Sequence, residues 1–396
     1  MTNSASSSQA SPSAFSEESL FSRTFLLVLA IQFSAGVPFA TFSLLPKYLL
    51  AERHEAPWVL GVSEGAFALI GVLLTPWVGR WLDSWGRRQV LVISLITATF
   101  SYWLFAFADN PFEYGLLRAV HGVAFILEFN ACATLVVDIA PIGRRAEAIG
   151  YFGAAGMLTN AAGPAVGEAI AAIFGWGWAF AQCSLWGLLG LYCARKLPKP
   201  SVSAEAGVAA ESIRYSSALL LAYLGSLALG MGVGVTRNYV SALVLTLGAT
   251  VIAPLLAAFS VGAIVQRAFF GFIPDRIGAR RATFLSLMAY GITVLALSGA
   301  SGQLAFIVLC AVVGLAHGTA YPAVTALAMQ QVAGNARGRV TAHLTGAFNV
   351  GLLLSTAGLA PLAPMLGFRA LIACGGATVL AVALGFASSA RFQRVP

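Results

Sequence analysis

Three glutamates stand inside long apolar runs of this sequence, where a charged side chain is energetically costly. They are Glu64, Glu128 and Glu168. Ionisable residues within membrane spans are rare and usually belong to an ion or proton pathway. Because a carboxyl group can take up and release a proton, these residues are our candidates for proton coupling. For Glu64, an interfacial carboxylate without a transport role is the alternative.

Residues 118 to 128 carry the densest set of such groups. Arg118, His121, Phe125 and Glu128 fall within roughly an 80° sector if this segment is helical. Burial favours a neutral carboxylic acid and a nearby arginine favours the carboxylate, an opposition that suits a proton-or-substrate switch. We predict that Glu128 and Arg118 line a cavity near mid-membrane. A structural ion pair or a packed polar contact is the alternative.

Other polar and aromatic side chains in the apolar runs are candidate substrate contacts. Histidines in such runs are more often structural donors than ligands, and His121 and His317 suggest a pseudo-symmetric pair across the cavity. With four histidines and no cysteine cluster, no metal site is expected. The candidate contacts are His121, Phe125, Asn160, Arg237, Tyr239, His317, Tyr321 and Asn349.

These residues need apolar helices to position them, and the composition supplies such helices. The chain has 396 residues, of which 59% are hydrophobic and 10% charged, against roughly 25% charged in a soluble domain. Apolar runs of about 20 residues or more, enough to cross a bilayer, can be counted twelve times. The sequence therefore predicts an all-α polytopic membrane protein.

The net charge of +8 is distributed unevenly along the chain. Most of the lysines and arginines fall in alternate loops on the side that also holds both termini, whereas Lys47, Arg53 and Arg369 fall on the other side. Cytoplasmic loops are enriched in such residues. We therefore expect a multi-pass protein of a bacterial inner membrane, with both termini in the cytoplasm. The excess of lysine and arginine is explained by the orientation of the protein in the membrane, so no nucleic acid partner is expected.

One charged turn occurs twice, which indicates a duplicated unit. The segment GRWLDSWGRR at residues 79–88 is followed 192 residues later by GFIPDRIGAR at residues 271–280. Each copy lies between two apolar runs. We predict two pseudo-symmetric six-helix bundles at residues 23–197 and 215–396, after a disordered cytoplasmic tail (1–22) and joined by a cytoplasmic linker (198–214). The matching residues are Gly79, Asp83, Gly86 and Arg88 in the first copy and Gly271, Asp275, Gly278 and Arg280 in the second.

This doubled motif between two six-helix halves resembles the major facilitator superfamily (MFS), and most closely its proton-coupled drug and metabolite exporters. Arg118 resembles the arginine of the family's helix-4 motif, which is associated with proton coupling. Gly163, Pro164 and Gly167 resemble the antiporter motif of the exporters. The match is partial, since Thr159 stands where a glycine is usual and Glu168 replaces the final glycine.

The resemblance also implies a gate at the repeated turn. Asp83, with Arg87 and Asp138, is expected to face the N-terminal end of the eleventh helix and to close the cytoplasmic side in the outward-facing state. A carboxylate is favourable at that positive helix end, by about 0.3–1 kcal/mol. A simple topogenic turn is the alternative.

The resemblance implies a secondary active transporter that moves a small solute by alternating access, with proton-coupled efflux as the expected direction. The alternatives are a proton-coupled symporter for a small polar or anionic metabolite and, more remotely, a transport-dead sensor. No enzyme is expected, because the Gly61–Gly65 match to a nucleophile motif lies in an apolar helix. No cofactor is expected, and the proton gradient supplies the energy. The expected partners are the substrate and the bilayer, around a monomer.

Overall fold

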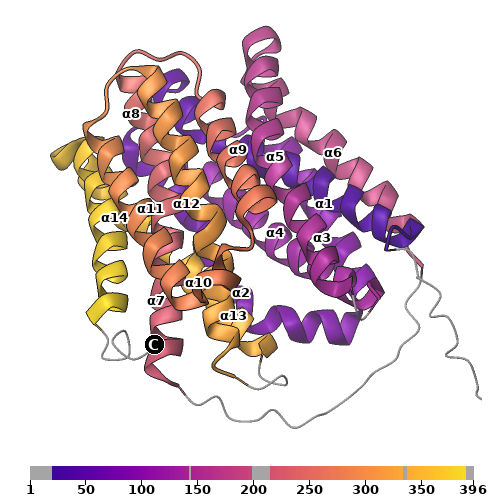
Figure 1. Cartoon of the computed structure of the whole chain (residues 1–396). Coiled ribbons are helices and arrows are strands. Elements are labelled where there is room, and N and C mark those ends of the chain that lie inside the picture. Colours follow the sequence, from indigo (N-terminus) through magenta and orange to yellow (C-terminus); the bar gives the residue numbers. More distant parts are fainter. Residues whose placement is uncertain (1–19, 142–143, 199–214, 333–336, 389–396) are drawn as a thin grey trace, which may run out of the picture.

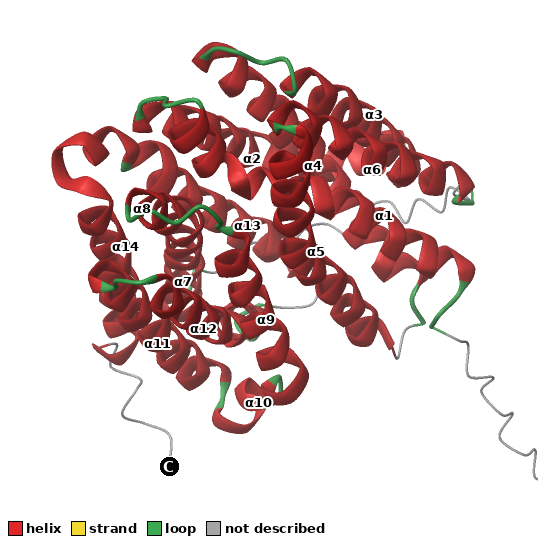
Figure 2. Ribbon diagram, turned by 90° about the horizontal axis from the view of Figure 1, so that it is seen from above, coloured by secondary structure: helices red, strands yellow, loops and turns green. Residues whose placement is uncertain are grey.

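The computed structural model describes residues 20–141, 144–198, 215–332 and 337–388. Within these ranges the regular elements are all helices (Figure 2). The predicted tail and linker lie almost wholly outside them, so the domain boundaries stay predictions. In chain order the first six helices are α1 (Arg23–Thr41, extended by η1 Phe42–Leu44 and η2 Lys47–Glu52), α2 (Pro57–Trp85), α3 (Arg87–Phe105), α4 (Pro111–Ile139), α5 (Arg145–Phe174) and α6 (Trp176–Lys196).

The second half follows the same plan (Figure 1). Its elements are α7 (Ser217–Gly234, extended by η4 Val235–Val240 and α8 Ser241–Thr246), α9 (Ala253–Phe270), α10 (Ile273–Ile277), α11 (Ala279–Gly299), α12 (Gln303–Met329), α13 (Arg337–Leu353, extended by η6 Leu354–Gly358 and η7 Ala360–Leu362) and α14 (Ala363–Ser388).

Twelve membrane crossings can be assigned among the described residues. Ten stretches are long and apolar enough to span a bilayer. One of them, Arg339–Ala387, has 49 residues and holds two helices, which meet at Gly367, where a φ of 73° breaks the helix. The 21-residue α6 supplies the remaining crossing. The predicted all-α fold with twelve spans is confirmed.

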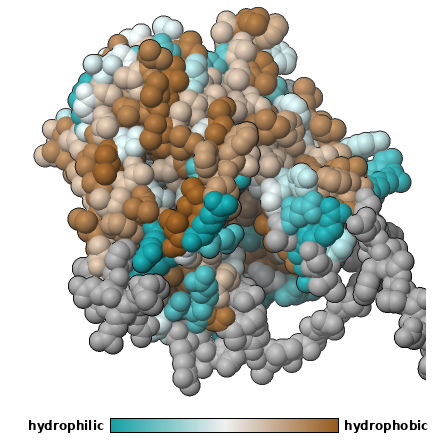
Figure 3. Space-filling model, viewed as in Figure 1, coloured by the Kyte–Doolittle hydropathy of each residue, from teal (hydrophilic) through white to brown (hydrophobic). Residues whose placement is uncertain are grey.

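Because successive crossings alternate in direction, α1 begins on the face where α14 ends. We call this the terminal face and the opposite one the distal face. Figure 3 shows apolar residues over most of the surface, with hydrophilic residues gathered in its lower part beside a hollow. Large side chains such as Phe107, Leu185 and Met365 are exposed on the outside. Such a surface is unfavourable in water and suits lipid.

The two copies of the repeated turn have the same backbone conformation. Gly86 has φ and ψ of 85° and 140°, and Gly278 has 86° and 141°. A side chain at this positive φ is strained, which explains the glycine at each position. The duplication read from the sequence therefore extends to local geometry.

The arginine two residues after each glycine ties the turn to the last helix of its own half. Arg88 donates hydrogen bonds to the carbonyls of Ala194 (3.3 Å) and Arg195 (2.8 Å) at the end of α6. Arg280 donates to the carbonyl of Phe386 (3.2 Å), near the end of α14. A cation is favourable at the carbonyl end of a helix. The motif thus has a structural role in closing each bundle.

Replacing Arg88 with glutamine is expected to destabilise the protein by about 1.5–3 kcal/mol, because two hydrogen bonds from a charged donor are lost. Thermal unfolding in detergent measures the effect. The control is Arg80→Gln in the same turn, since Arg80 is exposed and should change the melting temperature little. Equal melting temperatures for the two variants would contradict the assigned role.

The halves meet along two pairs of helices. Figure 2 shows α5 beside α9 and α2 beside α13. Along α2 the approach is close, because a Cβ added at Gly65 would lie 2.6 Å from the Cβ of Ala357 in η6. Gly61 faces Ala360 in the same way, one turn nearer the distal face. These small residues let the halves touch at the distal end of α2.

Candidate functional site

A buried ion pair joins α2 and α4. Arg118 Nη2 lies 2.9 Å from Glu64 Oε1, and the two side chains are 3% and 12% exposed. Both helices start at the distal face, and each residue stands seven positions after its helix start, so both lie about 10 Å down. Their equal depth is a signal that could have paired them from the sequence. The prediction from the sequence places Arg118 in a cavity with Glu128 and does not pair it with Glu64.

Aromatic rings surround this pair. The guanidinium carbon of Arg118 is 4.6 Å from the ring centre of Phe67 and 5.1 Å from that of Phe42. A cation over an aromatic face is attracted by the ring's negative centre. The ring contacts keep water from the guanidinium, so the charge of Arg118 is balanced mainly by Glu64.

A second arginine reaches this region from the other half. Arg237 lies on the π-helical segment η4, a type of irregularity frequent at functional sites. Its guanidinium carbon is 5.1 Å from the ring centre of Phe39 on α1, and it donates a hydrogen bond to the hydroxyl of Ser43. Two arginines and one carboxylate therefore share this part of the protein.

Phenylalanine rings connect the two arginines. Phe39, whose ring lies under the guanidinium of Arg237, stacks on Phe125 of α4 with ring centres 4.3 Å apart. Phe125 also contacts Phe67, the ring beside Arg118, at 5.6 Å. The structure thus brings together four of the predicted site residues, Arg118, Glu64, Phe125 and Arg237. Phe39 and Ser43 join them and were not among the predicted site residues.

Glu128 lies apart from that group. It follows Arg118 by ten residues on α4, which places it about 15 Å nearer the terminal face. It is 4% exposed, next to Cys132 one turn further along, and its Oε1 has no hydrogen-bond partner among the described residues. The geometry separates Glu128 from Arg118, although both are buried on one helix.

The two histidines occupy similar places on α4 and α12, and each is buried in its own half. Inside the first bundle the ring of His121 packs against that of Phe42, with ring centres 4.4 Å apart. Inside the second, the ring centres of His317 and Phe259 are 5.4 Å apart. The expected pseudo-symmetric pair across a cavity stays a prediction. Each histidine precedes a glycine that packs on a neighbouring helix, which keeps both rings within their own halves.

The remaining predicted substrate contacts have different surroundings. Tyr239 is buried, and its hydroxyl donates to the carbonyls of Ser355 and Thr356, which makes it part of the packing in this conformation. Asn349 lies where α13 meets Gly71 of α2. Asn160 is half-buried on α5, and Tyr321 of α12 is 38% exposed. None of these placements tests a role in binding.

Glu168 lies at the distal junction of the two halves. Its carboxylate accepts from Lys47 Nζ (2.7 Å) and from the backbone N–H groups of Ile252 (3.1 Å) and Ala253 (2.9 Å) at the start of α9. Lys47 also donates to the carbonyl of Thr250. The predicted coupling residue is thus in direct contact with the other half. Lys47 was not predicted to belong to a site.

The glycines of the antiporter motif allow α1 and α5 to pack closely. A Cβ at Gly163 would lie 2.5 Å from the carbonyl oxygen of Val37, and one at Gly167 would lie 2.7 Å from Thr41 Cγ2. The hydroxyl of Thr41 donates to the carbonyl of Gly163 (3.1 Å). The motif therefore sets the distance between two helices of the first half.

Replacing Gly163 with alanine is expected to cost about 1–3 kcal/mol of stability, because the new methyl group meets backbone atoms of α1. The matched control is Gly150→Ala on the same helix, where nothing lies within 4 Å of an added Cβ. Thermal unfolding of both variants in detergent measures the difference. A Gly163 variant as stable as the Gly150 variant would show that α1 and α5 can separate freely.

At the repeated turn, the first copy makes the ion pairs of the predicted gate in part. Arg87 Nε lies 3.1 Å from Asp138 Oδ2, whereas its distance to Asp83 is 4.0 Å. The side chain of Asp83 is 77% exposed. The expected contact of Asp83 with the eleventh helix concerns the state in which the terminal face is closed, and it stays a prediction.

Two pseudo-symmetric bundles that touch at one face around buried charges are the architecture of a secondary transporter. Comparison with known proteins gives the family. The Major Facilitator Superfamily profile matches residues 24–356 and, in a second match, 222–395. This chain belongs to that superfamily.

Similar proteins agree with this membership. Tetracycline resistance protein, class G, of Vibrio anguillarum is 30% identical over 348 residues, which are 83% of this chain and 84% of that protein. Multidrug resistance protein 2 of Bacillus subtilis is 25% identical over 303 residues, or 72% and 75% of the two chains. The solved nucleoside transporter NupG superposes with a TM-score of 0.76 at 12% identity, covering 92% of this chain and 99% of that one. That likeness concerns the fold alone.

Family and fold together define the general activity. The protein is a multi-pass integral membrane protein that transports small solutes, and it is not an enzyme. Among the described residues no three His, Cys, Asp or Glu side chains are grouped so that they can hold a metal ion.

Proposed function

We propose that this protein exports a small organic solute in exchange for protons, and that Glu64 is the group that carries the proton. The observation that carries the proposal is the buried Arg118–Glu64 pair, which a chain of phenylalanine rings connects to Arg237 of the other half. The names of the similar proteins, which refer to tetracycline and multidrug resistance, support export.

The pair suits exchange because its charge depends on one proton. With Glu64 ionised, Arg118 is neutralised and a carboxylate is available to a cationic or hydrogen-bond-donating part of the solute. A proton that reaches Glu64 from the distal side removes that negative charge and weakens the attraction for the solute. Proton and solute then compete for one residue, and such competition couples their opposite movements.

The orientation and energy source belong to the same proposal. We place the terminal face in the cytoplasm of a bacterial inner membrane, because Arg87, Arg88, Arg280 and Arg281 lie there and cytoplasmic sides are rich in such residues. The distal face is then the outside, and the structure has its outer ends in contact. The carrier works as a monomer without a cofactor, driven by the proton gradient.

Purified protein in vesicles with a trapped fluorescent pH probe tests the exchange. The panel contains tetracycline, a cationic dye, a nucleoside and an aromatic carboxylate, added to acid-loaded vesicles. Exchange predicts that at least one compound makes the lumen more alkaline than in protein-free vesicles while it enters. If compounds cross the membrane without any proton movement, the protein is a uniporter and the proposal is overturned.

Proton symport of a small anion is the second candidate, and Arg237 favours it. This guanidinium contacts a ring and a hydroxyl, and no carboxylate lies within ion-pair distance of it among the described residues. An anion bound there would make protonation of Glu64 easier, so anion and proton would travel together. In the same assay, symport predicts a more acidic lumen as an anionic compound enters vesicles of neutral pH.

A further inference from the structure

The distal contact between the halves is built around one carboxylate. Glu168 of α5 receives three hydrogen bonds, one from Lys47 and two from the first N–H groups of α9. Its side chain is 8% exposed and that of Lys47 is 15% exposed. We call Glu168, Lys47 and the start of α9 (Ile252 and Ala253) the distal latch.

The latch depends on negative charge at Glu168. The first N–H groups of a helix carry no intrahelical partner and form its positive end, so an ionised carboxylate satisfies them best. Hydrogen bonds from a cation or to a carboxylate are roughly twice as strong as neutral ones. A protonated Glu168 would lose the ion pair with Lys47 and bind α9 more weakly.

The latch ties two halves that must separate for the distal face to open. Glu168 and Lys47 belong to the first half, and α9 belongs to the second. Lys47 also donates to the carbonyl of Thr250, just before α9. Every one of these bonds to the second half therefore has to break when the transporter opens outward.

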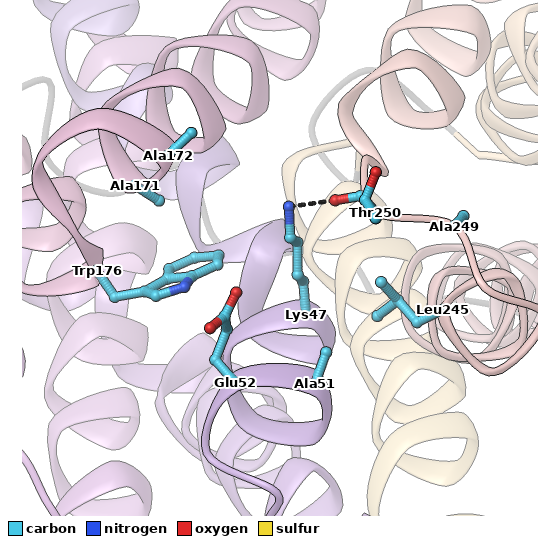
Figure 4. Close-up of a pocket in the computed structure, with 9 residues that line it drawn as sticks. All are labelled: Lys47, Ala51, Glu52, Ala171, Ala172, Trp176, Leu245, Ala249 and Thr250. Carbon is cyan, nitrogen blue, oxygen red and sulfur yellow. Dashed lines mark hydrogen bonds between the residues drawn. The ribbon is translucent and has the colours of Figure 1, made fainter.

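Water has access to the latch from the distal side. A pocket of about 350 Å³ is lined by Lys47, with the exposed residues Glu52 and Thr250 at its edge. Figure 4 shows Lys47 bonded to Thr250, with Trp176 and Glu52 beside it. On the inner side, Leu44 packs with apolar residues of α9. Because Lys47, the partner of Glu168, lines this pocket, we infer that protons reach Glu168 from the distal side.

The charged surroundings of Glu168 are few. Lys47 of η2 is the cation in contact with it, and Glu52 of the same segment faces the pocket. The neighbouring start of α9 contributes backbone N–H groups only, and α6 contributes the neutral Trp176. Glu168 is therefore the carboxylate on which the latch depends, and Glu52 is the other carboxylate at the pocket.

We propose that Glu168 is a second proton-binding group, separate from Glu64, and that its protonation from the distal side opens the distal face. The proton adds to the carboxylate, Lys47 keeps its charge, and the three hydrogen bonds are weakened or lost. In the proposed exchange, acid outside would thus favour the state that admits the proton to Glu64. The conformational claim itself does not require solute or proton transport.

The test measures the opening directly, without solute. Spin labels are attached at Phe107→Cys and Ser301→Cys, two exposed distal positions in different halves, after Cys374→Ser removes the exposed native cysteine. Distances between the labels are recorded in detergent from pH 8 to pH 5. In the otherwise unchanged protein the ratio of open to closed molecules is expected to rise as the pH falls.

Three variants separate the latch from other causes. Glu168→Gln, which resembles the protonated acid in shape and charge, is expected to be about tenfold more open at pH 8 and to lose the pH response. Glu52→Gln is expected to keep that response. Lys47→Gln removes the cation that favours the ionised carboxylate, so opening is expected at higher pH.

A pH response that persists in Glu168→Gln, disappears in Glu52→Gln, or keeps its midpoint in Lys47→Gln would overturn the proposal. Size-exclusion profiles confirm that each variant is folded. If Glu168→Gln opens as expected but the vesicle assay shows no proton movement, the exchange fails and the latch stands. If protons move while the labels report no pH-dependent opening, the latch fails and the exchange stands.

Discussion

Replacing Arg118 with glutamine is expected to destabilise the protein by about 3–5 kcal/mol, because Glu64 is left as an unpaired buried charge. The pair is held at 2.9 Å with Arg118 almost fully buried. Glu64→Gln should likewise destabilise, since the guanidinium then lacks its counterion. The double variant should lose much less than the sum of the two single losses. Thermal or denaturant unfolding of all four proteins in one detergent measures this cycle.

The coupling energy from the cycle decides whether the pair exists in the folded protein. Losses that simply add would mean that Arg118 and Glu64 do not interact. A parallel cycle with Arg118 and Glu128 serves as the control. Since about 15 Å of helix separates these two residues, their losses are expected to add within about 0.5 kcal/mol.

Glu64→Gln is expected to abolish uphill transport, with accumulation in proton-loaded vesicles reduced by about 100-fold or more. Without a group that alternates between carboxylate and acid at this place, solute and proton no longer compete. Downhill exchange of labelled solute across equal pH should continue, because glutamine has the same shape and the carrier can still change state. Accumulation and exchange are measured side by side in the same vesicles.

The comparison variant for this prediction is Glu128→Gln. Glu128 is buried near Cys132, and about 15 Å of α4 separates it from Arg118. It should retain most of the uphill transport. The opposite pattern, with accumulation lost in Glu128→Gln and kept in Glu64→Gln, would indicate that Glu128 carries the proton and would contradict the role of Glu64.

Much of the fold followed from the sequence because its signals are local. Long apolar runs predict the spans, and the doubled turn predicts the repeat. The structure extends that repeat to Gly86 and Gly278 and to the matching contacts of Arg88 and Arg280. These features depend on helix length and turn geometry, which a single segment determines.

The site was predicted less well because it depends on which helices meet. Arg118 was assigned to a cavity with Glu128, which shares its helix, yet its partner is Glu64 on a neighbouring helix at equal depth. Depth counted from the helix starts could have found this pair. No local signal pairs Glu168 with the start of α9. The two lie in different halves, and Glu168 and Ile252 are 84 residues apart in the sequence.

Proton release on solute binding tests the central claim most directly. The transported compound from the vesicle panel is added to purified protein in weakly buffered detergent solution, and a pH indicator records the change. Competition at Glu64 predicts the release of up to one proton per protein, which disappears in Glu64→Gln and persists in Glu128→Gln. Proton uptake on binding would instead indicate symport, and release unchanged in Glu64→Gln would contradict the role of that residue.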